Sequence, residues 1–199
     1  MLNHQFSWLN PSTVQEENGK YTLMATPKSD FFCNGGSQSD TGITPESLCN
    51  APYYYTEIKG DFVWKVKVSH DFVSVYDSSS IMVMVDLNNW AKTCFELTDF
   101  GTRAAVSVVT KNGESDDANG CNVQTDALWL QVTRVGRSFA FHYSLDGVKY
   151  DMTRFFTLPA GETVKVGMLA QSPTGEGGER HYENLTIEYK TVANIRAGE

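Results

Sequence analysis

The sequence predicts an all-β protein, a sandwich of two antiparallel sheets of the jelly-roll type. Stretches rich in β-branched and aromatic residues alternate apolar with polar side chains, and turn signals such as Asn18-Gly19 and Asp146-Gly147 separate them. About eleven short strands joined in this way are typical of such a sandwich. No stretch has the 3.6-residue period of an amphipathic helix.

Length and composition favour one domain over residues 1–199. Apolar residues make up 41% and aromatic residues 12% of the chain, which excludes a disordered protein. The net charge of −8 and the absence of Lys/Arg-rich runs argue against a nucleic-acid partner, and no apolar run is long enough to span a membrane. The N-terminus lacks the basic and apolar regions of a secretory signal, so we expect a cytoplasmic protein.

The cysteine spacing argues against a zinc site, and we expect no metal and no cofactor. The sequence has no C-x-x-C motif, and no histidine lies near a cysteine at the spacing of zinc ligands. Cys33 and Cys49 lie at the two ends of a polar segment, residues 29–52, and could pair in an oxidising compartment. Free thiols are favoured in the cytoplasm.

The first third of the chain predicts a hairpin, a long connection and a strand. Residues 6–8 and 20–26 form short strands, and residues 29–52 are too long for an idle connection in a compact domain. We therefore expect an ordered loop or a binding lid there. Three tyrosines, residues 53–55, close it, and residues 62–69 follow as a half-buried strand.

Three consecutive strands then form the centre of the predicted fold, within residues 76–109. Alternation predicts one apolar face, made by Ile81, Val83, Val85, Thr93, Phe95, Leu97, Ala104, Val106 and Val108. It predicts an opposite face of charged, small and sulfur-containing residues, made by Met82, Met84, Asp86, Lys92, Cys94, Glu96, Ala105 and Ser107. The second face is where we expect function.

A polar loop, residues 111–124, follows these strands and lacks the residue spacing of a calcium loop, so we expect it to be solvated. The alternation then returns in four more predicted strands, which are residues 125–133, 138–144, 149–156 and 163–171. A last strand is predicted for residues 181–190.

If the strands around residues 84, 94, 105, 129, 140 and 154 share one sheet, their non-core side chains surround a hollow. The predicted ligand-binding residues are Asp86, Trp90, Lys92, Glu96, Ser107, Trp129, Gln131, His142 and Arg154. Small side chains lie between them, and two indoles offer platforms on which a sugar ring can stack while charged groups bind its hydroxyls. The alternative is an outward face with scattered ion pairs, in which Lys92 and Glu96 pair with each other.

Catalysis is a weaker hypothesis than binding. Hydrolysis of a glycosidic bond needs two carboxylates beside the substrate, and Asp86 and Glu96 are the obvious pair on this face. His142 could assist as a proton shuttle, or could be a hydrogen-bonded structural histidine. The sequence contains no nucleophile elbow, phosphate-binding loop or dinucleotide fingerprint.

Several motifs together resemble a known family over nearly the whole chain. They are Tyr76-Asp77, the set Asp86, Trp90, Lys92 and Glu96, Trp129-Leu130, Tyr143 to Gly147, Arg154, and Val166 to Gly177. The chain resembles the uncharacterised concanavalin A-like family that includes the fungal "regulation of enolase" protein and bacterial cytoplasmic relatives. In one departure, Met84 stands where an arginine is frequent, which puts a shared anionic ligand in doubt.

The resemblance implies a lectin or glucanase-type jelly roll with a concave ligand face. It does not imply an activity, because the function of that family is largely unassigned. We expect a module that binds a carbohydrate or sugar-like small molecule without turnover, as a monomer or homodimer. One alternative is a carbohydrate-active enzyme using Glu96 and Asp86. Another, implied by the fungal name alone, is a regulator that binds a metabolic enzyme such as enolase.

Overall fold

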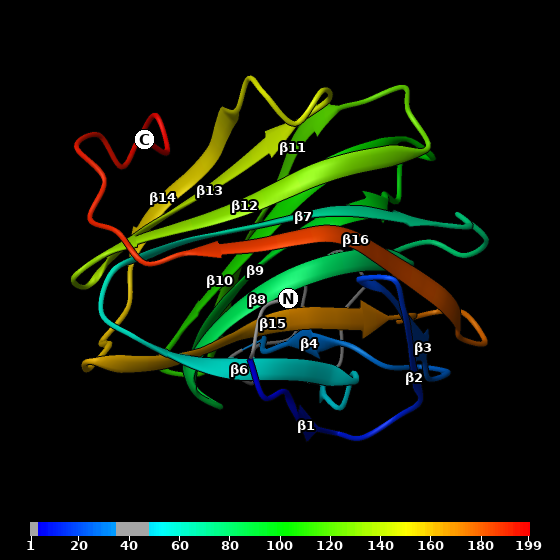
Figure 1. The fold of residues 1–199 in the computed structure, drawn as a ribbon. Helices are drawn as coiled ribbons and strands as arrows, with labels where there is room; N and C mark the ends of the chain where they lie inside the picture. Colours follow the sequence, from blue (N-terminus) through cyan, green and yellow to red (C-terminus); the bar gives the residue numbers. More distant parts are fainter. Residues whose placement is uncertain (1–3, 35–47) are drawn as a thin grey trace.

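The computed structural model describes residues 4–34 and 48–199, which form two seven-stranded antiparallel sheets packed as a sandwich (Figure 1). The first sheet has the order β1 (Ser7–Leu9), β6 (Tyr53–Lys59), β15 (Thr163–Gln171), β8 (Ser78–Asp86), β9 (Asn89–Leu97), β10 (Arg103–Lys111) and β11 (Glu114–Asn122). The second has the order β14 (Asp151–Thr157), β13 (Ser138–Ser144), β12 (Ala127–Val135), β7 (Phe62–His70), β16 (Gly178–Glu188), β3 (Lys20–Ala25) and β2 (Val14–Glu17). The all-β fold is confirmed.

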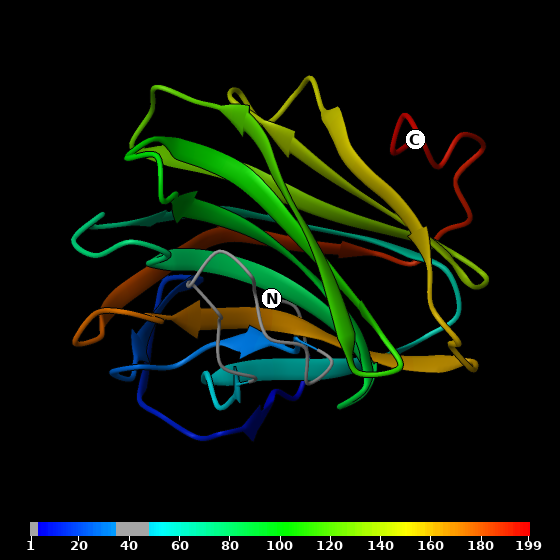
Figure 2. The same ribbon diagram turned by 180° about the vertical axis from the view of Figure 1, so that it is seen from behind.

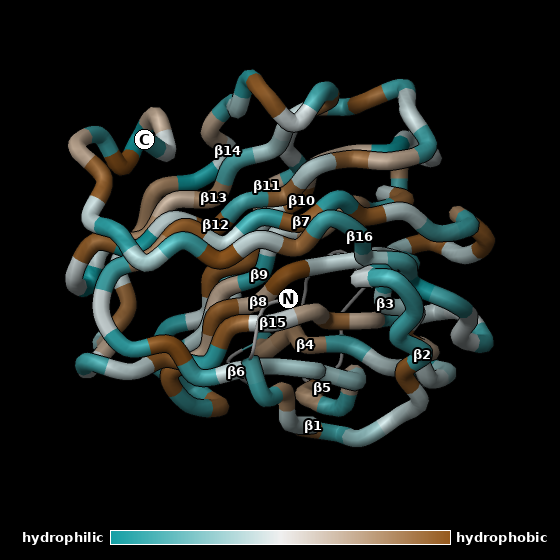
Figure 3. Tube along the Cα trace, viewed as in Figure 1, coloured by the Kyte–Doolittle hydropathy of each residue, from teal (hydrophilic) through white to brown (hydrophobic). Residues whose placement is uncertain are grey.

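The main core lies between the two sheets. It is filled by alternate residues of both sheets, such as Trp64 and Val66 of β7 in the second sheet and Ile81 and Val83 of β8 in the first. Figure 3 shows this hydropathic alternation along the strands of the second sheet. Because one face of every strand packs inward, a shift of one residue would expose the apolar set, which fixes the register.

A smaller apolar cluster lies on the outer face of the first sheet. The short strands β4 (Phe31–Phe32) and β5 (Leu48–Cys49) pair with each other and cross this face, as seen from behind in Figure 2. The cluster consists of Phe31, Cys33, Ala51, Tyr53, Met82, Met84, Trp90, Val108 and Leu169. Part of this face is therefore covered by protein rather than by solvent. The expected lid within residues 29–52 falls largely on residues 35–47, outside the described ranges.

The polar segment predicted as a solvated loop contains a strand, which is a correction. β11 pairs with β10 from Ala104↔Asn122 to Lys111↔Glu114, after a turn at Asn112-Gly113 where both residues have positive φ. Asn-Gly is a strong hairpin signal, and the ladder hydrogen bonds outweigh the low strand propensity of Asp, Asn and Gly. Its acidic side chains consequently border the first sheet.

Within the described ranges, nothing forms a helix with the length and apolar character that a membrane span requires. The same part of the chain contains no group of three His, Cys, Asp or Glu side chains placed to hold a metal ion. Cys33 and Cys49 are free thiols with their sulfur atoms 3.7 Å apart.

Candidate functional site

A cavity of about 740 Å³ opens on the outer face of the first sheet, beside β4 and β5. Strands β9, β10, β11 and β15 of the first sheet supply lining residues. Its lining residues are Lys28, Asp30, Phe32, Leu48, Tyr76, Lys92, Glu96, Asp99, Val106, Val108, Asp117, Asn119, Gln171, Pro173 and Thr174. The volume lies within the range of small-molecule sites.

Lys92 anchors the centre of the floor. Its ammonium donates to Asp30 Oδ1 at 2.8 Å and to Gln171 Oε1 at 2.9 Å, and its side chain is 3% exposed. Burial alone would lower the pKa of Lys92, but the negative charge and hydrogen bond of Asp30, together with Glu96, outweigh that effect and raise it. The lysine is therefore charged and held in one position.

Glu96 lies four residues beyond Lys92 on the same face of β9 and is 6% exposed. Among the described residues, no donor hydrogen-bonds to its carboxyl group and no cation pairs with it within 4.0 Å. Burial raises its pKa to about 8, because the lowering effect of Lys92 is too small to compensate and Asp30, Asp117 and Asp99 add repulsion. At neutral pH this carboxyl group is mostly protonated and directed at the cavity.

Tyr76 at the rim adopts a left-handed backbone conformation with φ of 68°. A bulky non-glycine residue is strained there, and such strain costs about 1–3 kcal/mol. The Tyr76 N–H donates to the Leu97 carbonyl at 2.7 Å, which holds the strained backbone in place. Burial, Asp99, Glu96 and Asp117 raise the pKa of its phenol, so the hydroxyl is a neutral donor.

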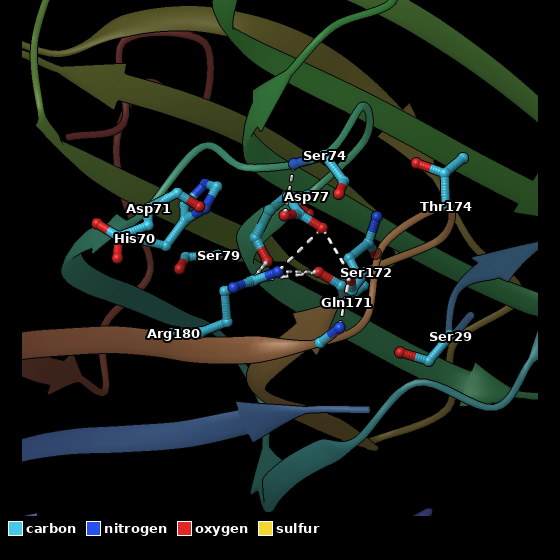
Figure 4. Close-up of polar contacts among 12 residues, drawn as sticks. Ser29, His70, Asp71, Ser74, Asp77, Ser79, Gln171, Ser172, Thr174 and Arg180 are labelled. Atoms are coloured by element: carbon cyan, nitrogen blue, oxygen red, sulfur yellow. Dashed lines mark hydrogen bonds and ion pairs between the residues drawn. The ribbon is translucent and has the colours of Figure 1, made fainter. Parts of the chain in front are cut away.

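A second buried charge cluster lies behind the cavity (Figure 4). Arg180 pairs with Asp77 at 3.2 Å, and both side chains are 2% exposed or less. Ser172 Oγ donates to Asp77 at 2.6 Å, the Ser74 N–H donates to Asp77 at 3.0 Å, and Arg180 donates to the Gln171 carbonyl. Gln171 thus connects the two clusters, since its backbone accepts from Arg180 and its side chain accepts from Lys92.

The expectation that the predicted ligand residues share one face is wrong. Lys92 and Glu96 lie on the first sheet, whereas Trp129, Gln131 and His142 lie on the outer face of the second sheet. The cause is strand pairing, because β12 hydrogen-bonds to β13 and β7 rather than to β10. No property of a single strand reveals which sheet it joins.

The polar residues of the second sheet are engaged in other contacts. His142 Nε2 donates to the Arg196 carbonyl at 3.0 Å, and Gln131 donates to His142 Nδ1 at 3.3 Å, so the C-terminal segment covers both. Burial lowers the pKa of His142, which is a structural histidine here. The half-buried Trp129 ring packs against Gly147, where an added Cβ would lie 2.7 Å from the ring.

Arg154 does not line the cavity either. It pairs with Asp116 at 2.9 Å across the edges of the two sheets, where β14 meets the first sheet. This ion pair connects β14 and β11, which are edge strands of the two sheets.

Three predicted ligand residues of the first sheet do not line the cavity either. Trp90 is fully buried, with its ring packed edge-on to Phe31 at 5.6 Å and its N–H donated to the Leu87 carbonyl. Ser107 lies opposite Thr93 on the interior side, so the predicted faces of residues 104–108 are reversed. β10 is apolar on both faces, because Ala105 and Val109 pack in the core while Val106 and Val108 line the cavity, and this removes the alternation signal.

Asp86 and Glu96 are too far apart for a catalytic pair. Asp86 accepts from the Asn88 N–H at 2.8 Å in the β8–β9 turn, opposite Asn89, whereas Glu96 pairs with Ser78 at the other end of the hairpin. At about 3.3 Å per residue, Asn89 and Glu96 are roughly 23 Å apart along the strand. Asp86 is a turn residue.

Sequence reasoning missed Asp30, Tyr76, Asp117 and Gln171 as lining residues. Asp30 lay in a segment expected to be functional for its length, and Tyr76 belongs to a motif of the family resemblance. Asp117 was assigned to a loop. Gln171 gave no signal, because it ends a strand of ordinary pattern.

The chain matches known proteins along most of its length. A family model described as "Protein of unknown function (DUF1349)" matches residues 8–190. "Regulation of enolase protein 1" from Saccharomyces cerevisiae is 30% identical over 177 residues, which cover 87% of this chain and 84% of the yeast protein. The crystal structure of a functionally unknown protein from the same yeast has a TM-score of 0.82 at 27% identity, covering 94% of this chain and 98% of that chain.

Carbohydrate-related proteins share the fold at low identity. The carbohydrate binding module CBM66 from Bacillus subtilis has a TM-score of 0.58 at 8% identity and covers 94% of this chain and 97% of that chain. The GH43 protein BlXynB from Bacillus licheniformis has a TM-score of 0.67 at 15% identity, covering 87% of this chain and 34% of that one. These likenesses show the fold alone, and the predicted concanavalin A-like sandwich is confirmed.

Proposed function

The chain belongs to the DUF1349 family, whose function is unassigned, and we propose that it binds a carbohydrate or sugar-like small molecule, without turnover, in the cavity of the first sheet. The observation that carries this proposal is the buried Glu96 carboxyl group, which faces the cavity with no protein partner among the described residues. Because the carboxyl group lines the cavity, a ligand donor can reach it, and a hydrogen bond made there away from bulk water contributes to affinity.

The rest of the lining suits a sugar ring. Asp30, Gln171 and Asn119 supply acceptors and donors for hydroxyl groups, while Val106 and Val108 supply an apolar floor for the C–H face of the ring. The fold shared with a carbohydrate binding module supports the same ligand class by analogy. The indole platforms Trp90 and Trp129 have no part in this proposal.

Catalysis by the predicted carboxylate pair receives no support from the geometry. Glycosidases hold their two carboxyl groups about 5–9.5 Å apart, whereas Asp86 and Glu96 lie at opposite ends of one hairpin. Incubation with a panel of chromogenic glycosides tests this point. We expect no release of chromophore. Release that Glu96→Gln abolishes would show that the protein hydrolyses glycosides rather than only binding them.

The experiment for binding is a glycan array followed by calorimetry with the glycans retained. We expect saturable binding that Lys92→Met abolishes and that the control Glu162→Gln leaves intact, since Glu162 is 79% exposed and outside the cavity. No retention of any glycan, or equal retention by Lys92→Met, would contradict the proposal.

A second candidate is the binding of a metabolic enzyme such as enolase, favoured by the name of the 30% identical yeast relative. A pull-down from a cell lysate tests it, and we expect enrichment of enolase over a bait of unrelated fold only if this candidate holds. A cytoplasmic location and a monomeric or homodimeric state remain predictions, which fractionation and light scattering can check.

A further inference from the structure

We propose that the cavity selects a sugar-like ligand bearing a primary ammonium group, and that Glu96 is the ion-pair partner of this group. The inference rests on the proposed function and specifies its ligand class. It follows from the distribution of charge in the cavity and from the position of Glu96 within it.

The cavity contains more acids than free cations. Its acidic lining residues are Asp30, Glu96, Asp99 and Asp117, and its basic ones are Lys28 and Lys92. Both lysines are already engaged, because Lys92 binds Asp30 and Lys28 pairs with Glu176 at 3.4 Å. Asp99 and Asp117 have no ion pair among the described residues. The charge in the cavity that is not already paired is therefore negative.

Glu96 is an independent sign of a ligand. It is 6% exposed, lines the cavity and lacks a donor among the described residues, although a buried carboxyl group ordinarily has one. A ligand ammonium group would supply three N–H donors and a positive charge at this point. A ligand carboxylate would instead meet three acidic side chains and be repelled.

The groups that face Glu96 come from every neighbouring element. Lys92 of β9 favours its ionised form, whereas Asp30 before β4, Asp99 in the β9–β10 turn and Asp117 of β11 oppose that form. Below pH 8, Glu96 therefore carries a proton in the free protein and must lose it to pair with a cation. Binding of an ammonium ligand should release about one proton at pH 7, and the affinity should rise up to about tenfold per pH unit until pH 8.

The test uses three sugars that differ only at carbon 6: 6-amino-6-deoxyglucose, glucose and glucuronate. Calorimetry of the full chain at pH 6, 7 and 8, in two buffers of different ionisation enthalpy, gives both affinity and proton release. We expect the amino sugar to bind at least about tenfold more tightly than glucose at pH 8, which is the affinity ratio that a modest ion pair gives. Glucuronate should bind most weakly of the three. Glu96→Gln should abolish the proton release and bring the affinity of the amino sugar down to that of glucose for the same variant, and Glu162→Gln should change neither.

Other results would overturn the inference. If glucose binds as tightly as the amino sugar, or if Glu96→Gln keeps the preference, the ammonium selectivity is wrong and the proposed carbohydrate binding stands. If none of the three sugars binds, the inference fails, and the proposed function fails with it only if the glycan array also retains no glycan.

Discussion

Two buried charge clusters meet at the end of β15, and they differ in how completely the protein satisfies them. Around Asp77 and Arg180, the described side chains and backbone carbonyls surround both charges (Figure 4). Around Lys92, the cation is satisfied but the neighbouring Glu96 carboxyl group is not. The two clusters share Gln171, so they have a common scaffold.

The difference separates a structural role from a ligand-binding one. Arg180 of the second sheet and Asp77 beside the first sheet link the two layers of the sandwich, and their pairing offsets the cost of burial. Glu96 gains no such compensation and lowers the stability of the fold at neutral pH. A group that destabilises a protein and lines its cavity is typical of a binding site.

The largest expected effect is that of Arg180→Met. It leaves the Asp77 carboxylate buried without its cation, and we expect a loss near the upper end of the ~3–5 kcal/mol range for such changes. Urea unfolding measures the free energy. The double variant Asp77→Asn with Arg180→Met should recover part of the loss, and a single-variant loss below about 1 kcal/mol would contradict a structural role.

Glu96→Gln should stabilise the protein, with a clear pH dependence. Because the folded-state pKa of about 8 lies above the ordinary 4.5, the unfolded chain ionises first and the wild type loses stability as pH rises from 4.5 to 8. The glutamine variant escapes this loss, so its gain should be small at pH 4.5 and of order 3–4 kcal/mol at pH 8. Urea unfolding at both pH values checks this, and a destabilised variant at pH 8 would contradict an unpaired Glu96.

Lys92→Met should cost less than Arg180→Met. Asp30 has a side-chain exposure of 15%, so water can solvate it when the ammonium is removed, and we expect a loss of roughly 1–2 kcal/mol. The pKa of Glu96 should also rise, because Lys92 lowers it in the wild type. Urea unfolding and a pH titration measure the two effects, and a loss equal to that of Arg180→Met would remove the contrast between the clusters.

Trp129→Ala should have the smallest effect on ligand binding. The ring lies on the outer face of the second sheet, so cavity affinity should stay within about twofold of wild type, equivalent to about 0.4 kcal/mol. Calorimetry with a retained glycan measures it. A loss of affinity in Trp129→Ala would show that the ligand binds on the second sheet instead.

The fold could be predicted from sequence because strand alternation and turn signals are local, as at Asp146-Gly147 and along β7. The site could be predicted only in part. Lys92 and Glu96 were found because they break an apolar pattern, but the partner Asp30 is 62 residues from Lys92 and no local signal joins them. Trp129 and His142 were misplaced because sheet membership depends on long-range pairing.

The contrast between the two clusters is tested most directly by the pKa of Glu96 itself. A carbon-13 NMR titration of glutamate side-chain carboxyl carbons, with the Glu96 resonance assigned by its absence in Glu96→Gln, measures this pKa. We predict a midpoint of about 8 in the free protein. A midpoint at or below the ordinary glutamate value of 4.5 would show that protein groups stabilise the carboxylate, and would contradict its role as the open group of the cavity.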